Sequence, residues 1–215
     1  ASESSALTLL DYTRERDILA GETLIFENRG LIKSFKNNLS KLTPCLFEYI
    51  YFSRPDSVVE KINVTQARIN IGKLLGKKIL ETWPNHDIDI IVPVPDTSVI
   101  FATGIKDILQ IPIRQGFIKN RYVDRTFIMK NFQMINKNIK RKLSPNKEII
   151  ANKNILIIDD SIVRGNTSRH IVQQARKCNA KKIYFASCAP IVKNTNQYGI
   201  YIPTKTELLA FEKTV

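Results

Sequence analysis

Two short apolar runs constrain the fold of this chain more than any other feature of its sequence. The runs Ile88 to Val94 and Ile155 to Ile158 are rich in aliphatic residues, which predicts strands buried on both faces, as in a parallel sheet. Before the first run, apolar residues over Thr65 to Thr82 recur at helical spacing until Trp83-Pro84. Strands that alternate with helices predict an α/β fold with a mainly parallel sheet. Further predicted elements are helices over 99–109 and 168–178 and strands over 111–114 and 183–189.

The chain divides into three regions. Within residues 1–35, two short alternating segments flank the turn Asn28-Arg29-Gly30, which predicts a β-hairpin. Residues 36–44 are polar and end at Pro44, so we interpret them as a linker. Residues 45–215 show the alternation of strands and helices, which predicts one domain.

Bulk composition narrows the class of protein. Hydrophobic residues make up 43% of the 215 positions, so the chain can bury a substantial core. No apolar run reaches the roughly 20 residues that a membrane span needs, and we expect no membrane partner. Cys45, Cys178 and Cys188 lie far apart without a CxxC pair, which favours free thiols in a cytoplasmic protein over disulfides or a zinc site.

The net charge of +13 raises the question of nucleic-acid binding. The lysines are spread along the chain, as in Lys130 to Lys142, and no nucleic-acid docking motif accompanies them. A positive field also suits a polyphosphate substrate. We therefore do not expect nucleic acid to be the main partner.

The most informative segment joins a predicted buried strand to two adjacent carboxylates, Asp159 and Asp160. Open α/β sheets bind ligands at the carboxyl ends of their strands, where this pair would lie. After the Arg164-Gly165 turn, residues 166–168 begin a helix whose unpaired N–H groups and dipole suit a phosphate. The glycine patterns of a Walker loop and of a dinucleotide fingerprint are both missing. An isolated Asp-Asp pair would more often cap a turn, but the combination favours a sugar-phosphate site.

Ile157 to Ser168 resembles the phosphoribosyl-pyrophosphate (PRPP) binding motif of type I phosphoribosyltransferases, in the form typical of amidophosphoribosyltransferases. That family commonly has Thr where this chain has Asn166. Val92 to Ser98 resembles the family's pyrophosphate loop, and Lys119 to Ile128 resembles its flexible loop, although the family usually has Gly at the position of Asp124. Without the resemblance, Val92 to Ser98 would equally well be a strand end followed by a helix N-cap. Lys119 to Ile128 would then more often be a solvated basic loop.

The resemblance implies a type I phosphoribosyltransferase fold and an enzyme that transfers ammonia, taken from glutamine in complete members, to C1 of PRPP. The products would be 5-phosphoribosylamine and pyrophosphate, in the first step of de novo purine biosynthesis. The implied PRPP-binding residues are Asp159, Asp160, Arg164, Gly165, Asn166, Thr167 and Ser168. The implied Mg²⁺ ligands are Thr97, Asp159 and Asp160. The implied catalytic cations, which close over the pyrophosphate, are Lys119, Arg121 and Arg125.

The resemblance also concerns the two ends of the chain. Residues 1–35 resemble the last part of a glutaminase domain whose nucleophilic cysteine is absent here, so we expect no glutamine-dependent activity from this chain alone. Thr206 to Ala210 resembles a helix after which the family continues, so we expect the domain to be incomplete at this end. No iron–sulfur cluster is expected, because the matching position falls at Asn196 or Gln197. Purine nucleotides as feedback ligands and a homo-oligomeric complete form are implied as well.

Other functions stay open at this point. A nucleobase-salvage phosphoribosyltransferase shares the PRPP motif but attaches a ready-made base, and the Lys119 to Ile128 loop argues against it. A regulator could use the same fold to sense PRPP and bind DNA through its basic surface. A catalytically inactive relative is a further alternative, because Asp124 and Asn166 depart from the family pattern.

Overall fold

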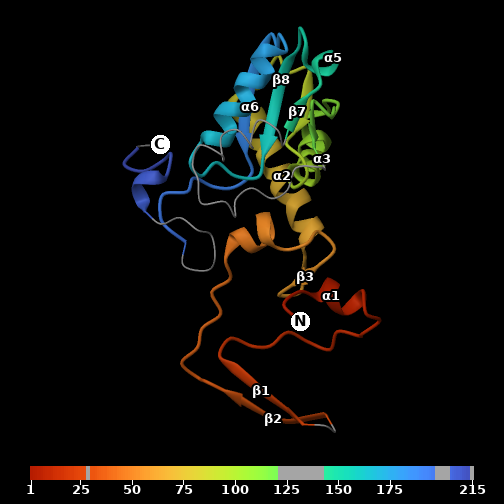
Figure 1. Ribbon diagram of the computed structural model, residues 1–215, viewed down its shortest axis with the longest axis vertical. Coiled ribbons are helices and arrows are strands. Elements are labelled where there is room, and N and C mark those ends of the chain that lie inside the picture. Colours follow the sequence, from red (N-terminus) through yellow and green to blue (C-terminus); the bar gives the residue numbers. More distant parts are fainter. Residues whose placement is uncertain (28–29, 121–142, 197–203, 214–215) are drawn as a thin grey trace. The chain divides into compact units, whose positions relative to one another are not determined.

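The computed structural model describes residues 1–27, 30–120, 143–196 and 204–213 (Figure 1). The chain forms two compact units, Ala1–Gln66 and Ala67–Val215. Within the described residues, no helix is long and apolar enough to cross a membrane. The linker and the domain limits proposed from the sequence stay predictions.

A three-stranded parallel sheet forms the centre of the second unit. Its strands are β5 (Ile90–Pro93), β8 (Asn154–Asp159) and β9 (Lys182–Ser187), in the order β5-β8-β9. Every residue of β5 and β8 is buried, as expected for strands that are covered on both faces. The predicted apolar strands and their parallel arrangement are therefore confirmed.

Helices lie on both sides of the central strand β8 (Figure 1). α6 (Asn166–Lys177) packs on one face, where Ile171 and Ala175 share a core with side chains of β5 and β8. α3 (Ser98–Leu109) contacts β5 and β8 from the other side, and α2 (Val64–Thr82) packs against α3. The three predicted helices are confirmed, with small shifts at their ends.

The helices α2 and α3 approach each other closely because glycines lie at their contact. A Cβ added to Gly104 would overlap the carbonyl oxygen of Ile69 and come within 2.9 Å of the backbone nitrogen of Lys73. A Cβ at Gly72 would likewise overlap the carbonyl oxygen of Phe101. The two backbones therefore touch, and this contact fixes α3, whose first turn carries part of the candidate site.

The strand predicted over 111–114 is reduced to a single parallel bridge between Ile91 and Ile113. The Ile91 amide donates to the carbonyl oxygen of Pro112 at 3.0 Å, and a longer ladder would next need N–H groups from Pro112 and Pro93. Proline has no N–H, so the ladder stops on both sides. The short strand predicted here is therefore observed only as this single bridge.

A second pair of strands was not predicted. β6 (Phe117–Lys119) pairs antiparallel with β7 (Leu143–Pro145), and the short helix α5 (Lys147–Ile150) follows. These elements lie at the two ends of the basic stretch 119–147, where the sequence has no clear periodicity. Phe117 is the anchor of the pair, because it is buried in the main core.

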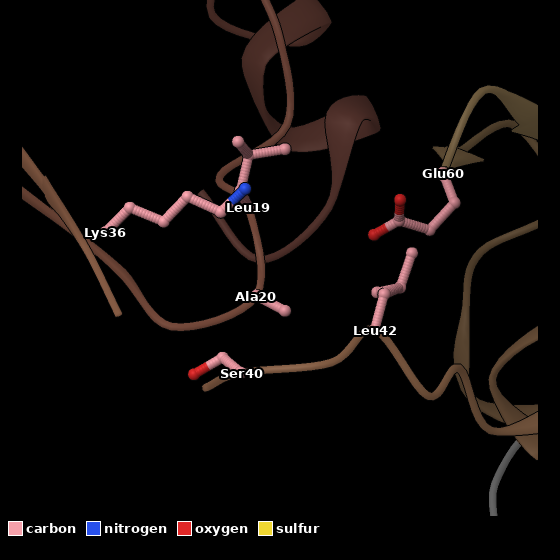
Figure 2. Close-up of a pocket in the computed structure, with 6 residues that line it drawn as sticks. All are labelled: Leu19, Ala20, Lys36, Ser40, Leu42 and Glu60. Carbon is pink, nitrogen blue, oxygen red and sulfur yellow. The ribbon is translucent and has the colours of Figure 1, made fainter. Parts of the chain in front are cut away.

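The first unit consists of short elements. They are α1 (Ser4–Thr8), β1 (Glu22–Glu27), β2 (Gly30–Lys36), η1 (Glu48–Phe52), β3 (Val58–Val59) and β4 (Ile62–Asn63). β1 and β2 pair antiparallel, which confirms the predicted hairpin. A small hollow of about 140 Å³ in this unit contains none of the candidate site residues; its lining is Leu19, Ala20, Lys36, Ser40, Leu42 and Glu60 (Figure 2).

The last described segment is not the helix predicted over Thr206 to Ala210. It contains only a short 3₁₀ turn, η3 (Lys205–Glu207), after which Leu208 is extended with φ −75° and ψ 132°. The Leu209 amide donates to the carbonyl oxygen of Val163 at 2.9 Å instead of continuing a helix. The helix prediction was therefore wrong, because this tertiary contact outweighs a local helical preference.

Candidate active site

Two adjacent carboxylates, Asp159 and Asp160, lie where β8 ends at the carboxyl edge of the sheet. Asp159 is the last residue of the strand and is 8% exposed, while Asp160 is half-buried. Their carbonyl oxygens accept hydrogen bonds from the amides of Cys188 and Ala189, at 3.0 and 2.8 Å. The end of β9 therefore holds the backbone of both acidic residues, at the edge where the sequence predicted them.

The electrostatics of this pair are unusual for surface carboxylates. Burial raises the pKa of Asp159 to about 7, and the negative charge of Asp160 adds to the effect. Burial also raises the pKa of Asp160. Hydrogen bonds from the Ser161 and Thr97 hydroxyls and the positive charge of Arg68 act in the opposite direction on that pKa. A carboxylate pair in such a place is costly to ionise, and a bound cation would offset the cost.

The loop after β5 meets the loop after β8. Thr97 immediately precedes α3, and its hydroxyl acts to lower the pKa of the Asp160 carboxyl group. The hydroxyl of the fully buried Ser98 lies 3.5 Å from Oδ1 of Asp159. The structure thus brings the three implied metal ligands together, from the ends of two neighbouring parallel strands.

The helix start after the carboxylates has the form expected of an anion site. Gly165 has left-handed φ 78° and ψ −2°, and it is the N-cap of α6. Because glycine has no side chain, no side-chain cap covers the first N–H groups of the helix. The Ser168 hydroxyl donates to the Gly165 carbonyl oxygen at 3.0 Å, whereas Asn166 and Thr167 are exposed. These residues therefore share one helix start, where N–H groups and the helix dipole favour a phosphate.

The implied cations have different positions. Lys119 ends β6 and forms an ion pair with Asp96, in the loop between β5 and α3, so it lies beside the loop of Thr97. The Nε atom of Arg164 lies 2.6 Å from Oε2 of Glu207, which turns this side chain toward the C-terminal segment. Outside the described residues lie Arg121 and Arg125.

Arg68 is a residue near the site that the sequence analysis did not select. It is 2% exposed, its guanidinium lies 6.0 Å from the centre of the Phe101 ring, and its charge favours the ionised form of Asp160. A buried arginine near two carboxylates compensates their charge. The available signal was spacing, because Arg68 lies one helical turn before Gly72, on the face of α2 that contacts α3.

A parallel sheet that ends in two carboxylates, beside a hydroxyl-bearing loop and an open helix start, is the arrangement of the phosphoribosyltransferase class. The family model described as phosphoribosyl transferase domain matches residues 59–201, and the chain belongs to this family. The type I phosphoribosyltransferase fold implied by the resemblance is therefore confirmed.

Over its whole length the chain is also similar to amidophosphoribosyltransferases. It is 47% identical to that of Escherichia coli (strain K12) and 41% identical to that of Saccharomyces cerevisiae; each match covers 100% of this chain and 43% of the relative. The solved structure of glutamine PRPP amidotransferase from B. subtilis, complexed with ADP and GMP, matches with a TM-score of 0.84 and 36% identity. That match covers 99% of this chain and 46% of the B. subtilis chain. The resemblance is thus confirmed, and the chain spans less than half the length of these relatives.

Proposed function

We propose that this chain carries the phosphoribosyl-transfer site of an amidophosphoribosyltransferase. Ammonia forms a bond to C1 of PRPP while the bond between C1 and pyrophosphate breaks, which gives 5-phosphoribosylamine, pyrophosphate and a proton. The observation that carries this proposal is the contact between the two loops beside the helix start at Gly165, where the Ser98 hydroxyl lies 3.5 Å from Oδ1 of Asp159. Such a site suits a sugar that has a phosphate at one end and a pyrophosphate at the other.

Each part of PRPP has a matching group in this site. The N–H groups at the start of α6, with the hydroxyls of Thr167 and Ser168, would bind the 5-phosphate. Asp159 and Asp160 would accept hydrogen bonds from the ribose hydroxyls. The loop of Thr97 would hold the pyrophosphate, and Lys119 would exchange its ion pair with Asp96 for this more highly charged anion.

The chemistry depends on position and charge. Departure of pyrophosphate leaves an electron-poor, oxocarbenium-like sugar, and nearby carboxylates would stabilise the positive charge that develops at C1. Holding C1 at a fixed place relative to ammonia and the leaving group lowers the entropic part of the barrier. In this proposal the loop with Arg121 and Arg125 closes over the pyrophosphate and excludes water, which would otherwise hydrolyse PRPP.

Mg²⁺ fits the donor set of the site. Thr97, Asp159 and Asp160 supply hydroxyl and carboxylate oxygens, which are the hard ligands that this ion prefers. The described part of the chain has no cluster of three or more His, Cys, Asp or Glu ligands. Mg²⁺ does not require one, because it commonly binds through one or two carboxylates together with substrate phosphates. When bound, the ion would neutralise charge on the pyrophosphate leaving group.

For the complete protein we propose glutamine as the source of ammonia, purine nucleotides as feedback ligands, a homo-oligomeric state and a cytoplasmic location. The B. subtilis relative was solved with ADP and GMP, which supports a nucleotide ligand. Salvage of a nucleobase is less well supported, because the full-length similarity is to amidophosphoribosyltransferases. A DNA-binding regulator has only the net charge of +13 in its favour.

A turnover assay tests the proposal. The chain is given PRPP and Mg²⁺ at mildly alkaline pH, with either an ammonium salt or a mixture of purine and pyrimidine bases, and released pyrophosphate is measured. We expect release with ammonium alone, and its loss in the double variant Asp159→Asn, Asp160→Asn. Asp107→Asn, on the exposed side of α3, is the matched control and should keep the activity. Release that depends on a base instead would identify a salvage enzyme.

A further inference from the structure

The C-terminal segment contacts three consecutive residues of the loop that precedes α6. The Leu209 amide donates to the carbonyl oxygen of Val163 at 2.9 Å. The carboxylate of Glu207 accepts a hydrogen bond from Nε of Arg164 at 2.6 Å. The Leu209 side chain lies against Gly165, where an added Cβ would be 3.2 Å from Leu209 Cδ2. Glu207 and Leu209 together thus contact all three residues that precede the helix start.

These contacts matter because the loop has no regular structure of its own. Val163 and Arg164 belong to neither β8 nor α6, and Gly165 has a left-handed φ of 78°, which glycine adopts without steric cost because it has no side chain. A phosphate held by backbone N–H groups requires those groups to point at one place before it arrives. The contacts of the Val163 carbonyl with Leu209 and of the Arg164 guanidinium with Glu207 restrict the backbone just before these N–H groups.

The sign of the charge on Glu207 argues for a specific role. A carboxylate near a phosphate site repels the ligand, so it disfavours binding unless it orients something that helps. The Arg164 and Glu207 side chains are 33% and 31% exposed, so water screens their ion pair only in part. Leu208, between the two contacting residues, is 4% exposed, which anchors the segment in the protein.

We infer that Glu207 is a positioning residue for phosphoribosyl transfer, which acts through Arg164 to hold the phosphate loop in its binding form. This inference rests on the proposed function, because the loop is taken to bind the 5-phosphate of PRPP. It assigns to the C-terminal segment a part in substrate affinity rather than in the chemical step. Loss of the contact should therefore raise Kd and KM for PRPP and leave kcat nearly unchanged.

The test compares PRPP binding by titration calorimetry, with Mg²⁺ present, for the full 215-residue chain and its variants. Wild-type binding is measured first and reports on the proposed function alone. Glu207→Ala should weaken binding about tenfold, and Glu207→Gln, which still offers an oxygen to Nε, should weaken it less. Glu148→Ala on α5 removes the same charge from an exposed site and should leave Kd unchanged.

A double-mutant cycle shows whether Glu207 acts through Arg164. In an Arg164→Ala background, the further change Glu207→Ala should have no added effect on Kd. Tighter PRPP binding by Glu207→Ala would overturn the inference, because the carboxylate would then merely compete with the phosphate. Additive effects of the two changes would overturn it as well. Amide hydrogen exchange of residues 161–168 provides a readout without PRPP, and exchange should be faster in Glu207→Ala than in the wild type; unchanged exchange would contradict the inference.

Discussion

The hydroxyl of Ser98 lies 3.5 Å from a carboxylate oxygen of Asp159, and this contact joins the loops that follow two neighbouring strands. The two residues are 61 positions apart in the sequence, and both side chains are buried. The loop after β5 is thereby oriented against the acidic pair at the end of β8. If these loops form one site, a change in either should alter the binding of the same ligand.

We predict that Ser98→Ala weakens PRPP binding by about three- to tenfold, since the hydrogen bond that orients the Asp159 carboxyl group is lost. The fold should persist, because the smaller side chain leaves α3 and its contacts in place. Calorimetry with PRPP and Mg²⁺ measures the effect, and thermal unfolding checks the fold. Ser144→Ala, at an exposed position of β7, is the control. An equal loss of affinity in this control would contradict a specific role of Ser98 in PRPP binding.

We expect the hydroxyl oxygen of Thr97 to contribute to Mg²⁺-dependent binding of PRPP. Replacement by Val removes the hydroxyl and keeps the shape, so we predict about tenfold weaker Mg²⁺-dependent binding of PRPP. Replacement by Ser keeps the oxygen and should stay close to the wild type. A chelator should reduce the wild-type affinity strongly and affect Thr97→Val less. Equal chelator sensitivity in both proteins would show that Thr97 has no part in binding the ion.

Close packing of α2 on α3 predicts a large effect of a single methyl group. Gly104→Ala would place Cβ against the backbone of Ile69, and backbone cannot move aside as a flexible side chain can. We expect a loss of about 1–3 kcal/mol in the free energy of unfolding. Urea denaturation measures it, with the exposed α3 residue Lys106→Ala as control, which should change stability by less than about 0.5 kcal/mol.

We predict that the interactions of Asp87, at the opposite edge of the sheet, contribute to stability in a pH-dependent way. A hydrogen bond from Lys182 and another from the Tyr184 hydroxyl, at 2.7 Å, lower the pKa of Asp87 below its ordinary 3.8. Because the folded pKa is the lower one, the stabilisation is complete above the ordinary value and is lost as pH falls through the folded value. Asp87→Asn should therefore destabilise the protein near pH 7 and by less near pH 2.5, as measured by urea unfolding. A difference that grows toward low pH would contradict this assignment.

The sequence predicted those parts of the site that depend on neighbouring residues. An apolar run followed by Asp159 and Asp160 places carboxylates at a strand end, because buried parallel strands need continuous apolar side chains. Gly165 followed by small polar residues predicts a helix start, because such residues are preferred at helix N-termini. The central sheet, three helices and the hairpin in the first unit were predicted in this way.

Contacts between distant residues could not be predicted from such patterns. Arg164 and Glu207 are 43 positions apart, and the family resemblance suggested that Arg164 faces the phosphate. Only the three-dimensional structure shows that a carboxylate from the C-terminal segment holds its side chain. The helix predicted over 206–210 was wrong for the same reason, because Leu209 pairs with Val163. The spacing of Arg68 to Gly72 points to the buried face of α2, but a charge on a helix normally marks its exposed face, so the sequence alone does not show that Arg68 is buried.

The most direct test of the account is calorimetric titration of PRPP, with Mg²⁺, into the wild-type chain and into Asp160→Asn. We predict saturable binding of a single PRPP per wild-type chain and loss of most of that affinity in the variant, with thermal unfolding confirming that the variant is folded. Absence of binding in the wild type, or equal binding by a folded Asp160→Asn, would contradict the claim that the carboxylate pair and the start of α6 form a PRPP site.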